Sequence, residues 1–203
     1  MVNGKVQMSG RVGVRVMRAP GPGLAWRLRN TLRWSFLFGW LANGAAKALS
    51  ALTGVPTLTA ELRAVLIRGD GSRVNYGVLS RRVVTTAFVT FMVDQMQTDT
   101  TAWGDMKWHD SGVGSTAENV ANTDMETTDG ESRVAGSQTE GAANVYVSVG
   151  TISYTSTKAI TEHGLFNAST GPTLLDRSVF SAVNVVNGDS IQYTYSLSVN
   201  SGG

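Results

Sequence analysis

The sequence predicts a mainly β protein: a β-sandwich or jelly-roll-like domain with one short helix over residues 58–203, preceded by a basic N-terminal segment, residues 1–57, that contains a helix. Three observations lead to this prediction. Short runs of alternating apolar and polar residues are separated by Gly-rich turns. The basic residues gather in the first part of the chain, and the 203 residues include 23 Gly but no Cys.

The N-terminal segment differs in pattern from the rest of the chain. Its first part ends at a Pro-Gly-Pro-Gly run, residues 20–23, which interrupts regular structure. Apolar residues then recur at helical spacing, as Trp34, Leu37 and Leu41 do. This spacing predicts a helix over about residues 24–52.

Several roles compete for that helix. Its apolar run, residues 34–46, is 13 residues long, whereas a membrane span needs about 20. The run also begins 33 residues into the chain, which is late for a secretory signal. Docking to a partner protein is the favoured role, and contact with a membrane surface and ordinary core packing are the alternatives. The residues expected to bind the partner are Arg27, Arg29, Arg33, Trp34, Phe36, Phe38 and Trp40.

The charge of the chain is divided unevenly. Residues 1–82 contain 13 basic and two acidic residues, a net charge of +11, and residues 83–203 contain four basic and 13 acidic residues, a net charge of −9. This division predicts either an anionic partner for the first part or contact between the two parts in an assembly. Nucleic acid would fit the sign of the charge, but Trp residues in an apolar helix favour packing over stacking on bases, so nucleic acid is a minor hypothesis.

The elements predicted for residues 58–112 are a hairpin, a helix and a short strand. Residues 61–80 hold two apolar runs around Gly69-Asp70-Gly71-Ser72, which is a hairpin signal. The next stretch predicts a short helix, because six of its residues share one helical face. These are Ala87, Phe88, Phe91, Met92, Gln95 and Met96. Residues 106–112, MKWHDSG, predict a short strand.

Residues between Trp108 and Tyr146 contain no aromatic residue and are dominated by Gly, Ser, Thr, Asn, Asp and Glu. This composition predicts a long polar loop with one strand at residues 132–138. A loop of this length inside a compact domain is usually functional or shared with neighbouring subunits.

The last third predicts the clearest strands. One strand is expected to carry Val145, Val147 and Val149 on one side, with a bulge or bend at Gly150. A hairpin follows around Asn187-Gly188, a dipeptide that suits a tight type I′ turn, and its second strand alternates over ten residues. The residues expected in the core are Val147, Leu165, Phe166, Phe180, Ile191, Tyr193 and Tyr195.

Few residues suggest chemistry. His109-Asp110-Ser111 contains the three residue types of a hydrolytic triad, but consecutive residues do not converge on one reaction centre. His109-Asp110 and Glu162-His163 could meet as a metal site. The favoured interpretation is that each His packs at a strand end and bonds a neighbouring carbonyl group.

Acidic residues are frequent between residues 105 and 131, but their spacing does not match an EF-hand. They are Asp105, Asp110, Asp124, Glu126, Asp129 and Glu131. We expect a solvated acidic loop. The absence of Cys and the two His argue against thiolate and multi-histidine sites, so the sequence predicts neither a cofactor nor a metal.

Residues 61–203 resemble a widespread group of tailed-bacteriophage structural proteins, described as tail, fibre or head-associated virion proteins. The most distinctive part is the block ITEHGLF, LLDRSVF and VVNGDSIQYTYSL within residues 160–197. The resemblance implies a building block of the particle that is not an enzyme. It does not extend to residues 1–57.

The predicted function is therefore a structural component of a tailed-phage virion, as a head-decoration or head–tail or tail accessory protein. It is expected to self-assemble, to contact other virion proteins through its N-terminal segment, and to be located in the virion after assembly in the bacterial cytoplasm. The alternative is a module that binds a membrane or host envelope, such as a receptor-binding tail protein. A hydrolase acting on host polysaccharide is a third hypothesis.

Overall fold

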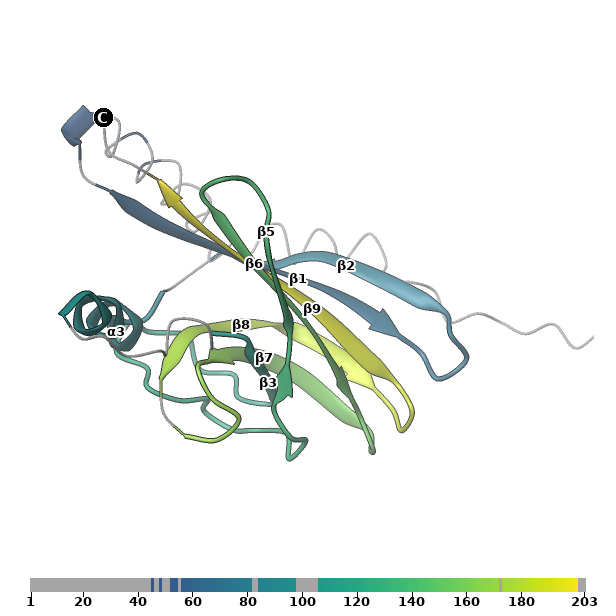
Figure 1. Ribbon diagram of the computed structural model, residues 1–203. Coiled ribbons are helices and arrows are strands. Elements are labelled where there is room, and N and C mark those ends of the chain that lie inside the picture. Colours follow the sequence, from purple (N-terminus) through teal and green to yellow (C-terminus); the bar gives the residue numbers. More distant parts are fainter. Residues whose placement is uncertain are drawn as a thin grey trace, which may run out of the picture.

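The computed structural model describes residues 45, 48, 52–54, 56–81, 84–97, 106–171 and 173–200. Between residues 57 and 200 the described residues form two antiparallel β-sheets and one helix, α3, which confirms the predicted mainly β fold (Figure 1). One sheet has five strands in the order β2-β1-β9-β6-β5, and the other has four in the order β4-β3-β7-β8. The elements are β1 (Thr57–Ile67), β2 (Arg73–Ser80), α3 (Thr86–Gln97), β3 (Trp108–Gly112), β4 (Val134–Ala135), β5 (Ser137–Glu140), β6 (Val145–Ser153), β7 (Lys158–Phe166), β8 (Leu174–Val185) and β9 (Ser190–Asn200).

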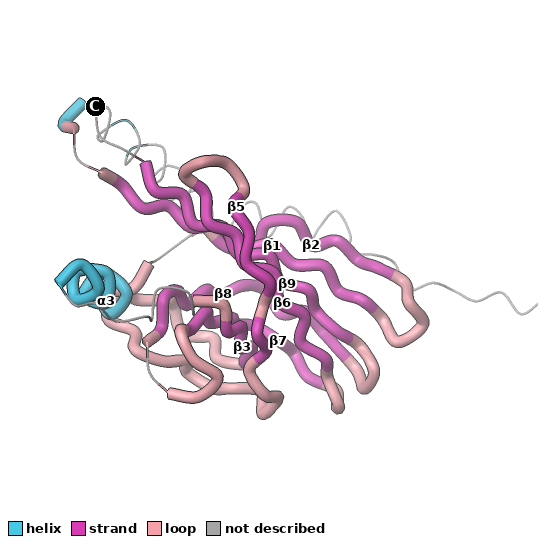
Figure 2. Tube along the Cα trace, in the orientation of Figure 1, coloured by secondary structure: helices cyan, strands magenta, loops and turns pink. Residues whose placement is uncertain are grey.

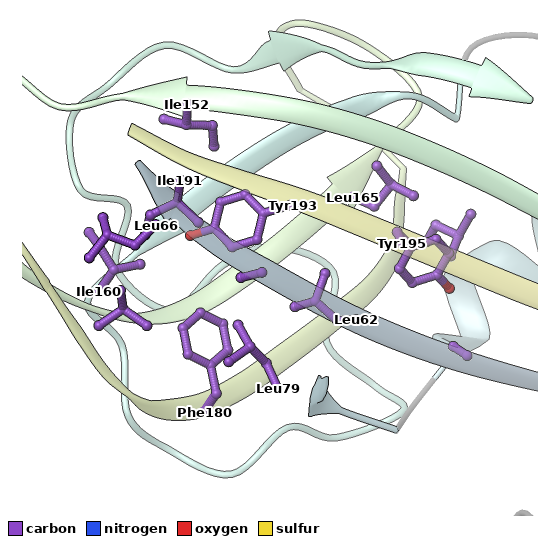
Figure 3. Close-up of a cluster of buried hydrophobic side chains, with 14 of the residues drawn as sticks. Leu62, Leu66, Leu79, Ile152, Ile160, Leu165, Phe180, Ile191, Tyr193 and Tyr195 are labelled. Carbon is purple, nitrogen blue, oxygen red and sulfur yellow. The ribbon is translucent and has the colours of Figure 1, made fainter. Parts of the chain in front are cut away.

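The main core lies between the two sheets. Strands β1 and β9 pair without interruption from Thr57 and Asn200 to Ile67 and Ser190, so their alternation places one complete set of apolar side chains inward. Figure 3 shows this set against residues of the four-stranded sheet, with Leu62, Leu66 and Ile191 fully buried. Each such side chain contributes about 1.5–3 kcal/mol of transfer free energy.

Most of the predicted core residues are buried, and one is not. Leu165, Phe180, Ile191, Tyr193 and Tyr195 belong to the main core. Phe166 is buried in a second, smaller cluster with Met125 and Leu174. The prediction for Val147 is wrong, because it is only half-buried on the opposite face of β6.

Strand β6 faces the core with small and aromatic residues instead of its valines. It pairs with β9 so that Ser148 lies opposite Tyr195 and Gly150 lies opposite Tyr193. Paired residues share a face of the sheet, so Ser148, Gly150 and Ile152 point inward. The valines at 145, 147 and 149 therefore lie on the outer face.

Both predicted hairpins form, but the second turn differs from the expected type. No residue other than Gly has a positive φ among the residues described, so Asn187 cannot occupy a type I′ turn, which needs a positive φ at both central positions. The β8–β9 connection is instead a four-residue loop with Gly188 at φ 89°. Asp189 holds it against the β1–β2 turn, accepting hydrogen bonds from the backbone N–H of Gly69 at 3.1 Å and from Arg68 Nη1 at 2.6 Å.

Helix α3 confirms the predicted helix. Thr85 caps its first turn, because its Oγ1 accepts a hydrogen bond from the backbone N–H of Phe88 at 3.2 Å. Phe88 is buried, whereas Met96 is 78% exposed, so the prediction that both lie on one covered face is wrong for Met96. The helix lies at the end of the sandwich where the two sheets diverge (Figures 1 and 2).

The predicted strand at residues 132–138 is two strands in different sheets. Strand β4 pairs with β3 in one sheet, and β5 pairs with β6 in the other, with Gly136 between them. A Cβ atom at Gly136 would lie 2.7 Å from His109 Nε2 and 2.8 Å from Ser148 Oγ, so only glycine fits this crossing. The preceding loop, residues 113–133, contacts the outer face of the four-stranded sheet through the bonds described below.

Of the helix predicted at residues 24–52, the structure describes only residues 45, 48 and 52, which are helical. All seven predicted partner-binding residues lie outside the described residues, namely Arg27, Arg29, Arg33, Trp34, Phe36, Phe38 and Trp40. Within the described part of the chain, none of the helices has the length and apolar character needed to cross a membrane.

Candidate functional site

The chemically interesting residues form two buried clusters on opposite faces of strands β3 and β7. Because side chains alternate along β3, His109 and Ser111 face the five-stranded sheet and Asp110 faces the loop of residues 113–133. His109, Asp110 and Ser111 therefore form no triad, as the sequence predicted.

The first cluster, which we call the histidine cluster, consists of His109, His163 and Ser148. His109 Nδ1 lies 3.0 Å from His163 Nε2, and His109 Nε2 lies 2.8 Å from Ser148 Oγ. All three residues have 0% exposure. The expectation that each His bonds a carbonyl group at a strand end is therefore wrong, because the strand register of β3 and β7 brings the two imidazoles together.

Glycine makes room for this cluster. A Cβ atom at Gly150 would lie 2.5 Å from His109 Cδ2 and 2.7 Å from its Cγ, and Gly136, between β4 and β5, lies against the same ring. The sequence pattern that could have indicated this space is the alternation in β6 of the small residues Ser148 and Gly150 with larger neighbours. Sequence reasoning assigned Gly150 to a bend and missed its role beside His109.

Both imidazoles are neutral near pH 7. Burial lowers the pKa of His109 to about 4. Burial, together with the neighbouring His109, lowers the pKa of His163 well below its ordinary value. A neutral imidazole has one donor and one acceptor nitrogen. His163 Nδ1 has no hydrogen-bond partner in the structure, so the tautomer that makes it an acceptor has the lower cost, since an unpaired N–H would lose more.

A chain of tyrosine and serine hydroxyl groups borders the histidine cluster. The His163 ring packs against Tyr193 with centroids 4.5 Å apart, and Tyr193 OH lies 3.3 Å from Tyr154 OH. Tyr154 donates a hydrogen bond to Ser111 Oγ at 3.1 Å, and Ser111 donates to Asp129 Oδ2 at 2.5 Å. These hydrogen bonds link the polar side chains between the two sheets to Asp129, in the loop of residues 113–133.

The histidine cluster has the bond pattern of a nucleophile and its base, with Ser148 beside His109. A substrate cannot reach it, because Ser148 and both histidines are fully buried. The sequence-based metal hypothesis fares no better: the histidines meet, but Asp110 and Glu162 point to the opposite face of the sheet and bind arginines. Among the described residues, no three His, Asp or Glu side chains gather as metal ligands.

The second cluster, which we call the loop clamp, is centred on the fully buried Glu162 and on Arg177, which is 2% exposed. Arg177 Nε donates to Glu162 Oε2 at 2.7 Å. Glu162 also accepts backbone N–H bonds from Gly114 at 3.1 Å, Thr127 at 2.8 Å and Glu126 at 3.2 Å. These bonds offset the desolvation cost of a buried ion pair and fix the loop to β7 and β8.

Two further cations hold the same loop. Arg133 Nε donates to Asp110 Oδ2 at 3.0 Å, and its guanidinium lies 3.4 Å from the centroid of the Phe166 ring. Lys158 Nζ donates to Glu131 Oε1 at 2.6 Å. Together with Arg177, these two cations fix the loop to the four-stranded sheet.

The prediction of a solvated acidic loop is therefore wrong for Asp110, Asp129 and Glu131. Their side chains are buried or largely buried and bind basic or hydroxyl groups, whereas Glu126 is exposed and also pairs with Arg177. The side chain of Asp124 is 67% exposed and lies 3.5 Å from Arg133, and Asp105 is outside the described residues. Three of the four basic residues after position 83, namely Arg133, Lys158 and Arg177, form ion pairs with acidic residues of the loop or of the strands below it.

The surface of the described residues has open depressions, and helix α3 carries an exposed apolar stripe formed by Val89, Val93 and Met96. One depression lies at the β5–β6 hairpin and is lined by Gln138, Glu140 and Tyr146 among others. A second runs between α3 and the loop at residues 120–123. The stripe lies on α3 and is the candidate interaction surface within the described residues.

Comparison with known proteins found no counterpart: no family model matches the chain, and no curated protein or solved structure is significantly similar to it. The resemblance to tailed-phage structural proteins thus stays a prediction from the sequence.

Proposed function

We propose that this chain is a structural component of a tailed-phage particle, as a head-decoration or head–tail or tail accessory protein. Its β-sandwich is displayed in several copies, and its N-terminal segment anchors it. Its partners are identical subunits and other virion proteins, and its place of action is the virion.

The observation that carries this proposal is that the ionisable groups of the two clusters are buried inside the sandwich and bonded there. The two histidines, Glu162 and Arg177 are buried and bonded to one another or to the backbone, where they brace the two sheets and the loop. Buried and hydrogen-bonded polar groups suit a rigid subunit of an assembly. A catalytic acid or base would instead have to lie within hydrogen-bond distance of a substrate.

The charge distribution supports the anchoring role. Residues 1–57 contain eight basic and no acidic residues, and residues 58–203 contain nine basic and 15 acidic residues, a net charge of −6. Arg133, Lys158 and Arg177 already bind acids of their own domain. An acidic surface on a neighbouring subunit suits the N-terminal excess of basic charge, and the aromatic residues supply affinity once the charges have brought the surfaces together.

The test is incorporation into particles. Particles are assembled in cells that supply the wild-type chain or its Trp40→Asp variant, purified, and analysed by quantitative mass spectrometry for the copy number of this chain. We expect a fixed copy number for wild type and loss of Trp40→Asp, because burying a charge in an apolar contact is costly. Ser35→Asp adds the same charge at a polar position of the segment and should be incorporated normally.

Absence of the wild-type chain from purified particles would contradict the proposal. The membrane alternative gives a separate result: wild-type chain that floats with liposomes in a density gradient but does not bind particles lacking it. Normal incorporation of Trp40→Asp would contradict the assignment of the anchor.

A further inference from the structure

Helix α3 is apolar on two sides, although only one of them is covered. Phe88 is buried in the main core, and Phe91 and Met92 pack against that core, which fixes the helix to the sandwich. On another side Val89 is 43% exposed, Val93 48% and Met96 78%. These three residues follow helical spacing and form a continuous stripe. A surface helix normally turns charged or polar residues to water, so a second apolar stripe indicates a contact surface.

The neighbouring loop extends this surface. The backbone N–H of Thr86 donates to the carbonyl oxygen of Val120 at 2.8 Å, which ties the loop to the start of α3. Val120 itself is 53% exposed. The depression between the two elements is lined by Thr90, Asp94 and Val120. We call the exposed stripe together with this depression the α3 face.

Acidic residues lie on and beside the α3 face. Helix α3 and residues 113–125 contain Asp94, Glu118 and Asp124, and no Lys or Arg. Asp94 lines the depression, and the side chain of Asp124 is 67% exposed, although its Oδ1 lies 3.5 Å from Arg133 Nη2. Burial and the charge of Glu118 raise the pKa of the buried Asp176 nearby, as expected where negative charge gathers.

The sequence contains one segment complementary to this face in both respects. Residues 24–41 carry three arginines and no acidic residue, and their apolar part includes Trp34, Phe36, Phe38 and Trp40. Residues 42–56 connect this segment to β1 and can span at most about 50 Å. Strand β1 begins at the same end of the sandwich as α3 (Figure 1), so a segment that leaves there can reach the α3 face of an adjacent subunit.

We propose that the α3 face binds residues 24–41 of a neighbouring copy of this chain. One part of this inference rests on the proposed function: the segment is assigned to a neighbouring copy and not to its own, because the subunits of an assembly must be joined. The contact is heterologous: each copy donates its arm to one neighbour and receives the arm of another. Arginines of the arm face the acids around α3, and its aromatic side chains cover Val89, Val93 and Met96.

The first test measures self-association of the full chain by sedimentation velocity. Val93→Asp places a charge in the contact, and we expect it to raise the dissociation constant of self-association about tenfold or more. Val93 is exposed, so the variant should fold, which a thermal melt checks. The control is Val186→Asp, because Val186 is 47% exposed and lies in the β8–β9 turn, away from α3. Equal association of the wild type and Val93→Asp would overturn the proposal.

The second test identifies the occupant. A photo-reactive benzoylphenylalanine is placed at position 96 of the full chain, and ¹⁴N- and ¹⁵N-labelled copies are mixed before irradiation. We expect cross-links from position 96 to residues 24–41 between copies of different label. Cross-links only within one copy, cross-links to α3 of a second copy, or cross-links that avoid residues 24–41 would each overturn the proposal. Particle copy number tests the proposed function separately, so the two can fail independently.

Discussion

At the scale of single residues, glycine decides where the buried polar groups of this sandwich can lie. Gly136 and Gly150 enclose the His109 ring, and Gly112 and Gly114 enclose the Glu162 carboxylate in the same way. A Cβ atom at Gly112 would lie 2.3 Å from the carbonyl oxygen of Thr127. The high glycine content thus serves close approach inside the sandwich as well as turns.

Gly150→Ala tests this role. The added Cβ would collide with the His109 ring, which is held on both sides, so we expect a loss of about 1–3 kcal/mol in the free energy of unfolding. Urea titration followed by Trp fluorescence measures it. Gly69→Ala is the control, because its Cβ would lie no closer than 3.4 Å to the Gly188 backbone. Equal stability of the two variants would contradict the packing described for His109.

At the scale of elements, the loop at residues 113–133 depends on side chains of the sheet below it. Its backbone N–H groups at Gly114, Glu126 and Thr127 bond to one carboxylate, Glu162, and Arg177 neutralises that carboxylate. The loop therefore acts as a third layer on the sandwich, although it contains no strand before β4 in the part of the chain described.

Glu162→Gln should release this layer. The amide removes the buried charge partner of Arg177 and leaves only its pair with the more exposed Glu126 at 3.2 Å, so we expect a loss of about 3 kcal/mol in the free energy of unfolding. Hydrogen exchange followed by mass spectrometry should show faster exchange at Gly114, Glu126 and Thr127. Glu131→Gln, which alters a pair nearer the surface, should cost less than about 1 kcal/mol and leave those three amides protected. Unchanged protection in Glu162→Gln would refute the loop clamp.

The sequence was sufficient for elements that depend on local chemistry. Turn glycines located both hairpins, helical spacing located α3, and ten alternating residues located β9. The predicted seven partner-binding residues lie outside the described residues and stay predictions. The face of β6 was predicted wrongly because Val145, Val147 and Val149 dominate its pattern, while its inward positions hold Ser148 and Gly150.

The histidine cluster could not be predicted, because it depends on contacts between distant parts of the chain. His109 and His163 are 54 residues apart, and they meet only through the register of β3 against β7. The loop clamp needs the pairing of β7 with β8, since Glu162 lies on β7 and Arg177 on β8. Residue types alone indicated that these groups could interact, and topology decided which ones do.

At the scale of the whole molecule, three buried groups make the stability depend on pH in opposite directions. His109, with a pKa of about 4, and His163, also lowered, bind protons more weakly in the folded state than in the unfolded state, where a His pKa is near 6.5. Their contribution is lost as pH falls below about 6.5. Burial raises the pKa of Asp176 to about 7, so its contribution is complete below about pH 4 and is lost as pH rises toward 7.

Between about pH 5 and 6, unfolding therefore takes up about two protons at the histidines and releases about one from Asp176. We expect the free energy of unfolding of the wild-type chain to fall by about 1.4 kcal/mol for each unit of decreasing pH. Asp176→Asn removes the opposing group, which should double this slope and raise stability at pH 8. The amide oxygen introduced by this substitution can keep the hydrogen bond that Ser178 Oγ donates to Asp176 at 2.7 Å.

His163→Gln removes one histidine titration and retains a side-chain amide that can bond His109 Nδ1, so its slope should be close to zero. Urea unfolding at half-unit pH steps measures the three slopes, and comparison within one variant cancels the direct cost of each substitution. Slopes that are equal in all three proteins would mean that these buried groups titrate alike in the folded and unfolded states, contrary to their burial between the sheets. If the slope changes in Asp176→Asn but not in His163→Gln, then His163 takes up no proton on unfolding in this pH range, and only the assignment of His163 is wrong. The two variants can be judged separately because Asp176 releases a proton on unfolding, whereas His163 takes one up.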